Sequence, residues 1–178
     1  NQYQKTGDEL VIQIDPKMSF GTGSHETTRL ILGQLETVDL KGKRVLDVGT
    51  GTGILAIAAV LMGAEKALGI DNDEWCLLNG TENVQLNGVT DKVEIRLAEV
   101  GDIEHTPCDV VIANIQRNVL LEIAEDLVLR TIKGGHIILS GLLHTDEEVI
   151  ESAYTALGLK RLSLARLNEW ICIVYSKP

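Results

Sequence analysis

The most chemically informative stretch of this sequence is a glycine-rich turn. Gly49, Gly51 and Gly53 alternate with threonines between an apolar run at residues 44–48 and a helical pattern at residues 54–62. Glycine lets the backbone adopt unusual dihedral angles and approach a ligand closely, and the start of a helix presents free N–H donors. A strand, a glycine turn and a helix in this order indicate a ligand-binding site.

An acidic residue follows at a distance that suits ribose recognition. Asp71 lies 22 residues after Gly49, at the end of a predicted strand over residues 67–70. A carboxylate there can accept hydrogen bonds from both hydroxyls of a ribose, which is the role we expect. The alternative is that Asp71 only caps the next helix. Asp47, inside the strand before the turn, leaves two interpretations open, bracing of the turn or contact with the ligand.

The spacing of the glycines argues against one class of enzyme. A dinucleotide-binding fingerprint, G-x-G-x-x-G, would place its third glycine at position 54, where this chain has Ile54. A nicotinamide-dependent oxidoreductase would share the turn and the acid, so it remains an alternative that this spacing disfavours.

The elements that must position these residues alternate between short apolar runs and longer helical patterns, which is typical of an α/β domain with a parallel sheet. Strands are predicted at residues 9–14, 44–48, 67–70, 93–97, 109–112 and 136–139. Helices are predicted at residues 26–38, 54–62, 72–87, 119–130 and 145–158, the last opened by a capping box of Thr145 and Glu148. Residues 159–165 and 170–175 also fit strands, and the short segment between them requires antiparallel pairing.

Composition narrows the classes of function. The chain has 178 residues, 26 acidic against 16 basic, and 3% aromatics, which argues against binding to nucleic acid. Its longest apolar run, residues 54–62, is far shorter than a bilayer span. The three cysteines form no C-x-x-C pair, so we expect no metal site. We expect a cytoplasmic protein without contact to membranes.

Several segments together resemble the bacterial ribosomal protein methyltransferases of the PrmA family, which are class I S-adenosylmethionine-dependent enzymes. The similar segments include D-P-K-M-S-F-G-T-G-S-H-E-T-T at 15–28, G-I-L-A-I-A-A at 53–59, G-I-D at 69–71, V-I-A-N-I at 111–115, S-G at 140–141 and E-W at 169–170. The resemblance implies a Rossmann-like fold with a mostly parallel seven-stranded sheet, an antiparallel C-terminal hairpin and helices on both faces. It also implies an N-terminal strand, cofactor-covering loop and helix over residues 1–40, followed by the cofactor-binding core over residues 41–178.

The resemblance implies S-adenosylmethionine as cofactor and S-adenosylhomocysteine as product. The cofactor contacts that it implies are Thr28, Gly49, Gly51, Gly53, Asp71 and Asn114. Phe20 is expected to cover the cofactor, and Glu99 to accept from the adenine amino group. Asn114 and Phe20 are also the residues expected to position an amine against the sulfonium methyl. Structural alternatives stay open for four of these residues. Thr28 is a helix-face threonine, Asn114 a strand-ending turn residue, Phe20 a core aromatic and Glu99 a solvated loop charge in these alternatives.

The implied substrate is an amino group of the large-subunit ribosomal protein L-11. Two departures from the family bear on that substrate. We expect that the N-terminal domain by which the family grips its substrate is not represented in this sequence, and Gln116, Arg117 and Asn118 stand where the family usually has small or apolar residues. Alternatives are another protein or a small molecule as acceptor, or a module that binds the cofactor without turnover. His25, inside the loop at 15–28, is a weak candidate for a general base.

Overall fold

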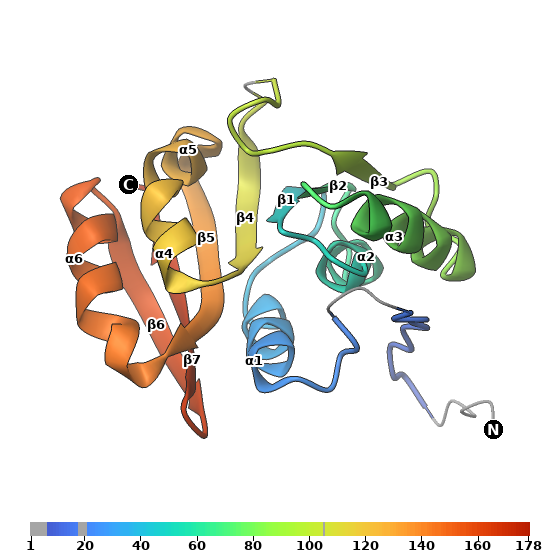
Figure 1. The fold of residues 1–178 in the computed structure, drawn as a ribbon, viewed down its shortest axis with the longest axis horizontal. Coiled ribbons are helices and arrows are strands. Elements are labelled where there is room, and N and C mark those ends of the chain that lie inside the picture. Colours follow the sequence, from blue (N-terminus) through green and yellow to red (C-terminus); the bar gives the residue numbers. More distant parts are fainter. Residues whose placement is uncertain (1–6, 18–20, 105) are drawn as a thin grey trace.

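A mostly parallel sheet forms the centre of the molecule (Figure 1). The structure, a computed structural model, describes residues 7–17, 21–104 and 106–178. The strands are β1 Arg44–Val48, β2 Lys66–Asp71, β3 Val93–Leu97, β4 Cys108–Asn114, β5 Thr131–Leu143, β6 Lys160–Leu167 and β7 Trp170–Ser176. The helices are α1 Glu26–Leu35, α2 Ile54–Leu61, α3 Glu74–Leu86, α4 Arg117–Glu122, α5 Ala124–Leu129 and α6 Glu147–Ala156, with a short 3₁₀ helix, η1, at His144–Asp146.

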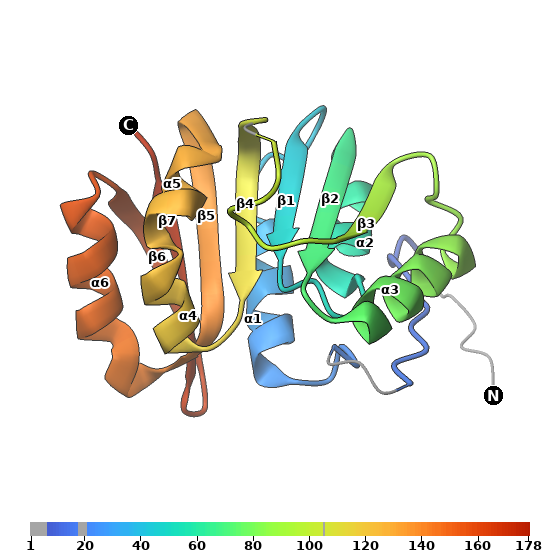
Figure 2. The ribbon, with the colours of Figure 1, turned by 45° about the horizontal axis from the view of Figure 1, so that its top comes forward.

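The seven strands lie in the order β3-β2-β1-β4-β5-β7-β6 (Figure 2). Strands β1 to β5 pair in parallel, whereas β7 pairs antiparallel with both β5 and β6. The predicted mostly parallel sheet with an antiparallel C-terminal hairpin is therefore confirmed. The order of the strands reverses between β1 and β4, and open α/β sheets bind ligands at the carboxyl ends of the strands on either side of such a point.

Helices cover both faces because successive side chains of each strand point to opposite sides. In β4, Val110 and Ile112 belong to the apolar cluster that includes α1, α2 and Val84 of α3. Val111 and Ala113 belong to the cluster that includes α4, α5 and α6. β4 is thus buried on both sides, as its unbroken apolar sequence predicts. None of the described helices is long and apolar enough to cross a membrane.

The N-terminal segment differs from its prediction. Residues 9–14 form no strand, so the predicted first strand is wrong. The segment instead bonds through its backbone to asparagine side chains of α3. Those side chains satisfy the backbone polar groups that a neighbouring strand would otherwise satisfy.

Two predicted helices also differ. The helical pattern at 119–130 is divided into α4 and α5, which meet at Ile123. The capping box of Thr145 and Glu148 does not form, because the chain first makes η1 and the Asp146 carboxylate accepts from the Leu143 N–H at 2.9 Å. A local hydrogen bond thus accompanies the later start of α6, with Asp146 and not Thr145 at the helix entrance.

Close packing between β2 and the glycine turn yields a stability prediction. A Cβ added at Gly69 would lie 2.6 Å from Thr50 Oγ1 and 2.9 Å from Ile95 Cδ1. We expect Gly69→Ala to lower the free energy of unfolding by about 1–3 kcal/mol, because the neighbours must shift. The measurement is urea denaturation followed by circular dichroism.

Gly33 provides the matched control. A Cβ at this position within α1 meets nothing within 4 Å. We expect Gly33→Ala to raise the free energy of unfolding by about 0.5–1 kcal/mol, because alanine favours the helix. Equal effects of the two substitutions would contradict the packing argument.

Candidate functional site

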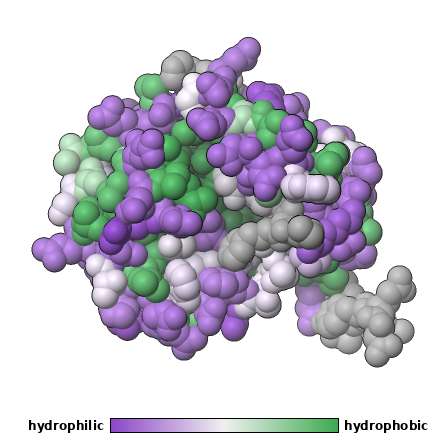
Figure 3. Space-filling model, viewed as in Figure 1, coloured by the Kyte–Doolittle hydropathy of each residue, from purple (hydrophilic) through white to green (hydrophobic). Residues whose placement is uncertain are grey.

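A cavity of about 1040 Å³ opens at the carboxyl ends of β1, β2 and β4, where the strand order reverses. Its described lining comes from the glycine turn, the ends of β2 and β4, the loop after β3, α4, α5 and the two residues His25 and Trp170. The face of the molecule drawn in Figure 3 carries apolar side chains between hydrophilic margins. The cavity lining itself combines apolar residues, such as Val48 and Ile115, with polar ones, such as Asp71 and Asn114. Such a mixture is typical of small-molecule sites.

The glycine turn is shaped so that other residues do not fit. Gly49, Gly51 and Gly53 have φ of 72°, 55° and 81°, a region that side chains disfavour. A Cβ at Gly49 would lie 2.5 Å from Ile115 Cγ2. Gly49 and Gly51 line the cavity, as expected, whereas Gly53 does not and is instead the N-cap of α2.

The end of β2 holds the turn in place. The Ile70 carbonyl accepts from the N–H groups of Gly49 and Thr50 at 2.9 and 3.0 Å. The Asp71 carboxylate accepts from the Gly51 N–H at 2.9 Å and lines the cavity. Backbone and side chain of β2 therefore bond to three successive residues of the turn.

Asp71 is not the cap of α3. The N-cap is Asp73, whose carboxylate accepts from the Trp75 N–H at 2.9 Å. Asp71 accepts from the Asp73 and Gly51 N–H groups, and a carboxylate has about four acceptor positions. The capping alternative is wrong, and Asp71 retains acceptor capacity at the cavity wall.

Asp47 lies beneath the turn and is fully buried. It accepts from the Thr50 hydroxyl at 2.6 Å and is not among the described residues that line the cavity. This geometry favours bracing of the turn over ligand contact. Burial raises the pKa of the Asp47 carboxyl to about 6, while the bond from Thr50 opposes that rise.

Asn114 ends β4 and lines the cavity beside Ile115 and Gln116. The loop that follows it is packed tightly against β5. A Cβ at Gly141, where φ is 80°, would lie 2.5 Å from the Ile115 carbonyl oxygen. This close contact between the loop and β5 holds the chain next to Asn114 at the carboxyl end of β4.

The remaining predicted cofactor contacts are Glu99, Thr28 and Phe20, and only the first of them lines the cavity among the described residues. Glu99 is exposed and lines the cavity after β3, as expected. Thr28 is buried in the first turn of α1, its Oγ1 has no partner among the described residues, and its neighbour Thr27 lines the cavity instead. Phe20 lies outside the described residues.

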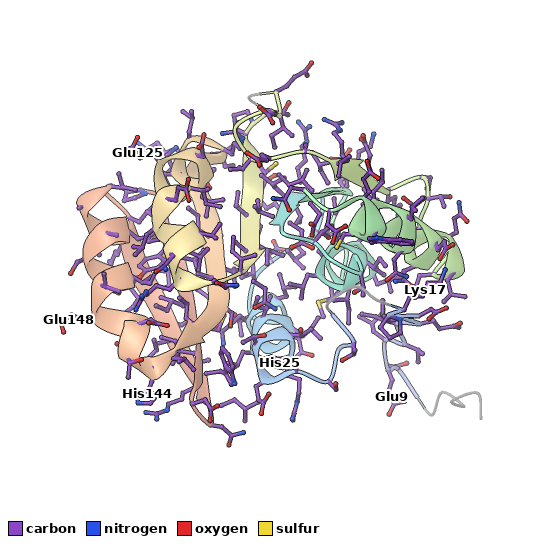
Figure 4. The ribbon with its side chains drawn as sticks, viewed as in Figure 1. Glu9, Lys17, His25, Glu125, His144 and Glu148 are labelled. Carbon is purple, nitrogen blue, oxygen red and sulfur yellow. The ribbon has the colours of Figure 1, made fainter. Side chains whose placement is uncertain are left out.

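Trp170 lies against His25 at the cavity wall. No site role is predicted for Trp170 from the sequence. The two rings lie edge to face with centroids 5.0 Å apart. Figure 4 shows His25 at the start of α1. Its Nδ1 accepts from the Thr27 N–H at 3.3 Å as the helix N-cap, so this nitrogen is engaged and cannot act as a base while it caps α1. His25 caps α1 and Trp170 begins β7, so no spacing in the sequence indicates that the two residues meet.

These residues fit the expected cofactor. The glycine turn permits close backbone approach, Asp71 offers carboxylate acceptors, and apolar groups from Val100, Ile115 and Val119 provide walls for a ring. The volume lies at the upper end of the range for ligand pockets, about 300–1,000 Å³, which leaves room for an acceptor side chain beside a cofactor. Across the described ranges, no group of three His, Cys, Asp or Glu side chains is arranged to hold a metal ion.

The buried acid yields a pH prediction. The folded-state pKa of Asp47, about 6, exceeds its ordinary value of 3.8, so the folded protein holds this proton more tightly than the unfolded chain does. Its contribution to the free energy of unfolding therefore falls as pH rises from about 4 to about 6, by an amount on the order of 3 kcal/mol. We expect Asp47→Asn to remove that fall, as measured by urea denaturation between pH 4 and 8. A difference between the two proteins that stays constant over this range contradicts the assignment.

Comparison with known proteins identifies relatives along the whole chain. Residues 1–178 match the family described as Ribosomal protein L11 methyltransferase (PrmA). The ribosomal protein L11 methyltransferase of Geobacter sulfurreducens is 46% identical over 169 residues, which cover 95% of this chain and 55% of the relative. That of Exiguobacterium sibiricum is 36% identical over 173 residues, covering 97% and 55%. The chain thus spans about half the length of these curated relatives.

Solved structures agree with the fold. The crystal structure of a ribosomal protein L11 methylase from Lactobacillus delbrueckii subsp. bulgaricus superimposes with a TM-score of 0.92 at 31% identity, covering 99% of this chain and 91% of that one. An RNA methyltransferase from Salinibacter ruber in complex with S-adenosyl-L-homocysteine gives a TM-score of 0.65 at 16% identity, covering 83% and 90%, which shows the fold alone. The match over all residues, with the relatives above 30% identity, leads to one conclusion: the chain belongs to the ribosomal protein L11 methyltransferase (PrmA) family.

Proposed function

We propose that this chain is a cytoplasmic S-adenosylmethionine-dependent methyltransferase that modifies amino groups of a protein, ribosomal protein L11. The observation that carries the proposal is the cavity at the strand-order reversal. It brings together the glycine turn, the Asp71 carboxylate and Asn114, which come from three different strand ends. Family membership and the names of the relatives support the choice of chemistry and of substrate.

The cofactor supplies the reactive group, a methyl on a positively charged sulfur. The protein's task is then to bind, orient and exclude water. Asp71 accepts hydrogen bonds from the ribose hydroxyls, Gly49 and Gly51 let the backbone approach the ligand, and Glu99 accepts from the adenine amino group. Thr28 Oγ1 is buried without a partner among the described residues but lies outside the described lining, so we assign the contact from α1 to its neighbour Thr27.

The acceptor side of the cavity suits an amine. Five carboxylates line the cavity, whereas no Lys or Arg occurs among its described lining residues; the acids are Asp71, Asp73, Glu99, Glu122 and Asp126. This charge attracts a cationic side chain. Burial beside apolar groups such as Ile115 and Trp170 would lower the pKa of the ammonium, whereas the carboxylates favour its charged form. The ammonium would release its proton to water, and the neutral amine would take the methyl that the cofactor supplies, with S-adenosylhomocysteine as the leaving group. Asn114 orients that amine through its side-chain amide.

The function is tested by transfer of a labelled methyl group from S-adenosylmethionine. The purified chain is incubated with ribosomal proteins from cells that lack this activity, and the products are separated on a gel. We expect label in ribosomal protein L11. Label in another protein would keep the chemistry and overturn the substrate, and binding of the cofactor without transfer to any protein would indicate a non-catalytic module.

Asn114→Ala tests the placement of the acceptor in the same assay. We expect transfer to fall about 100-fold or more, because a misplaced acceptor loses the alignment on which the reaction depends. Calorimetric titration with S-adenosylhomocysteine shows how much of the loss comes from cofactor binding. Unchanged transfer together with unchanged binding would place the acceptor elsewhere.

Asp71→Asn tests the cofactor site directly. Asparagine can keep one acceptor oxygen for the Gly51 N–H, but its NH2 group cannot accept from the Asp73 N–H, and the charge that favours bonds from hydroxyls is lost. We expect the Kd for S-adenosylhomocysteine to rise about tenfold or more by calorimetry, because hydrogen bonds to charged groups are worth about 1.5–3 kcal/mol. Asp102→Asn removes the same charge at an exposed position outside the described lining and should leave the Kd unchanged. Equal effects of the two would assign the change to net charge.

A further inference from the structure

An extended segment runs along α3 without joining the sheet. Residues 7–17, called the strap below, contain neither helix nor strand. Lys17 of the strap lies beside α3, and Glu9 lies further back along the strap (Figure 4). Helix α3 faces the strap with three asparagines, Asn79, Asn83 and Asn87, which we call the asparagine ladder. Their spacing of four residues places all three on one side of the helix and its C-cap.

The asparagine ladder bonds to strap backbone at two levels. At Gln13, the N–H donates to Asn87 Oδ1 at 2.9 Å and the carbonyl accepts from Asn87 Nδ2 at 2.7 Å. At Asp15, the N–H donates to Asn83 Oδ1 at 2.9 Å and the carbonyl accepts from Asn79 Nδ2 at 2.7 Å. The amides thus imitate the paired bonds of a neighbouring strand and fix the strap in register with α3.

Asn83 also reaches the glycine turn. Its Nδ2 donates to the Thr52 carbonyl at 3.0 Å, and the residue is fully buried. Thr52 in turn donates from Oγ1 to the Gly21 carbonyl at 2.7 Å. Gly21 has φ of 111°, and a Cβ there would lie 2.6 Å from Thr52 Oγ1. The turn is therefore bonded to the asparagine ladder on one side and to the chain that follows the strap on the other.

Helix α3 touches the turn directly at Gly80. A Cβ at this position would lie 3.3 Å from the Gly51 carbonyl oxygen. The strap carries a second attachment to the helix, because Lys17 forms an ion pair with Glu82. Strap, helix and turn are consequently joined by contacts that a shift of any one of them would disturb.

We propose that docking of the strap through the asparagine ladder is energetically coupled to cofactor binding at the glycine turn, with Asn83 as the positioning residue that joins them. The proposal rests on the proposed function, since it takes S-adenosylmethionine as the ligand of the turn. None of the three asparagines is among the described residues that line the cavity, so their effect on affinity passes through Thr52 and the strap. Coupling of this kind is reciprocal. The factor by which docking of the strap raises the affinity for the cofactor equals the factor by which bound cofactor favours docking of the strap.

The test compares Asn87→Ala with Gln85→Ala, a control on the exposed side of α3 whose side chain makes none of these bonds. Calorimetry measures the Kd for S-adenosylhomocysteine. We expect Asn87→Ala to raise it about fivefold or more, the lower end of typical coupling, and Gln85→Ala to leave it unchanged. Because Asn87 lies at the C-cap of α3 and outside the described lining, direct loss of a cofactor contact cannot produce this result.

Hydrogen exchange measures the reverse direction. The N–H groups of Gln13 and Asp15 donate to the ladder and report strap docking directly. We expect saturating S-adenosylhomocysteine to slow their exchange in the unchanged chain, and to slow it less in Asn87→Ala. A second pair of variants acts from the strap side: Gln13→Pro removes the donating N–H, whereas Gln13→Ala keeps it, and only the proline should raise the Kd.

The outcomes separate this proposal from the one on which it rests. Absence of S-adenosylhomocysteine binding to the unchanged chain overturns the proposed function. Binding with the same Kd, within about twofold, in the unchanged chain, Asn87→Ala and Gln13→Pro overturns the coupling alone. If S-adenosylhomocysteine leaves the exchange rates of the Gln13 and Asp15 N–H groups unchanged, the coupling is overturned as well.

Discussion

The hydrogen bonds between the end of β2 and the glycine turn are the constraint on which the site depends. The Ile70 carbonyl and the Asp71 carboxylate take the N–H groups of three successive residues, so the turn cannot move without breaking three bonds at the sheet edge. Only glycine tolerates the backbone angles that these bonds require at 49 and 51. Asp71, which holds the turn, also lines the cavity, so one side chain contributes both to the shape of the turn and to the charge of the cavity wall.

A second group of contacts joins the start of β7 to the start of α1 at the cavity wall. Strand β7 enters antiparallel beside β5 and begins with Trp170 near the start of α1. The turn before it bonds to the same region, since Asn168 Nδ2 donates to Glu26 Oε1 at 3.3 Å. The antiparallel hairpin therefore does more than complete the sheet, because it brings the Trp170 ring to His25 at the cavity wall.

Helix α3 connects the sheet edge to the N-terminal segment by two different kinds of contact. Toward the turn it presents Gly80, which admits a backbone carbonyl, and toward the strap it presents amide side chains that pair with backbone. Residues 9–14 have the apolar composition of a strand, yet the backbone groups of Gln13, and of Asp15 just beyond, bond to asparagine side chains. A side chain with one donor and one acceptor can substitute for a strand backbone, and local pattern does not distinguish the two.

Residue types and spacing determined the parallel strands, the glycine turn, Asp71 at the end of β2 and the antiparallel pairing of the last two strands, because each follows from short-range periodicity or from the length of a connection. The bonds of Asp47 and Asp146 join residues only three apart, yet the sequence pattern did not single them out. The conformation of the strap depended on neighbours distant in sequence, the asparagines of α3 and its C-cap. Tertiary structure alone decided that Asp71 bonds to Gly51 at the cavity wall and that Trp170 meets His25. Such contacts arise when the folded sheet brings separate strand ends together, whereas the preferences visible in a sequence extend over only a few residues.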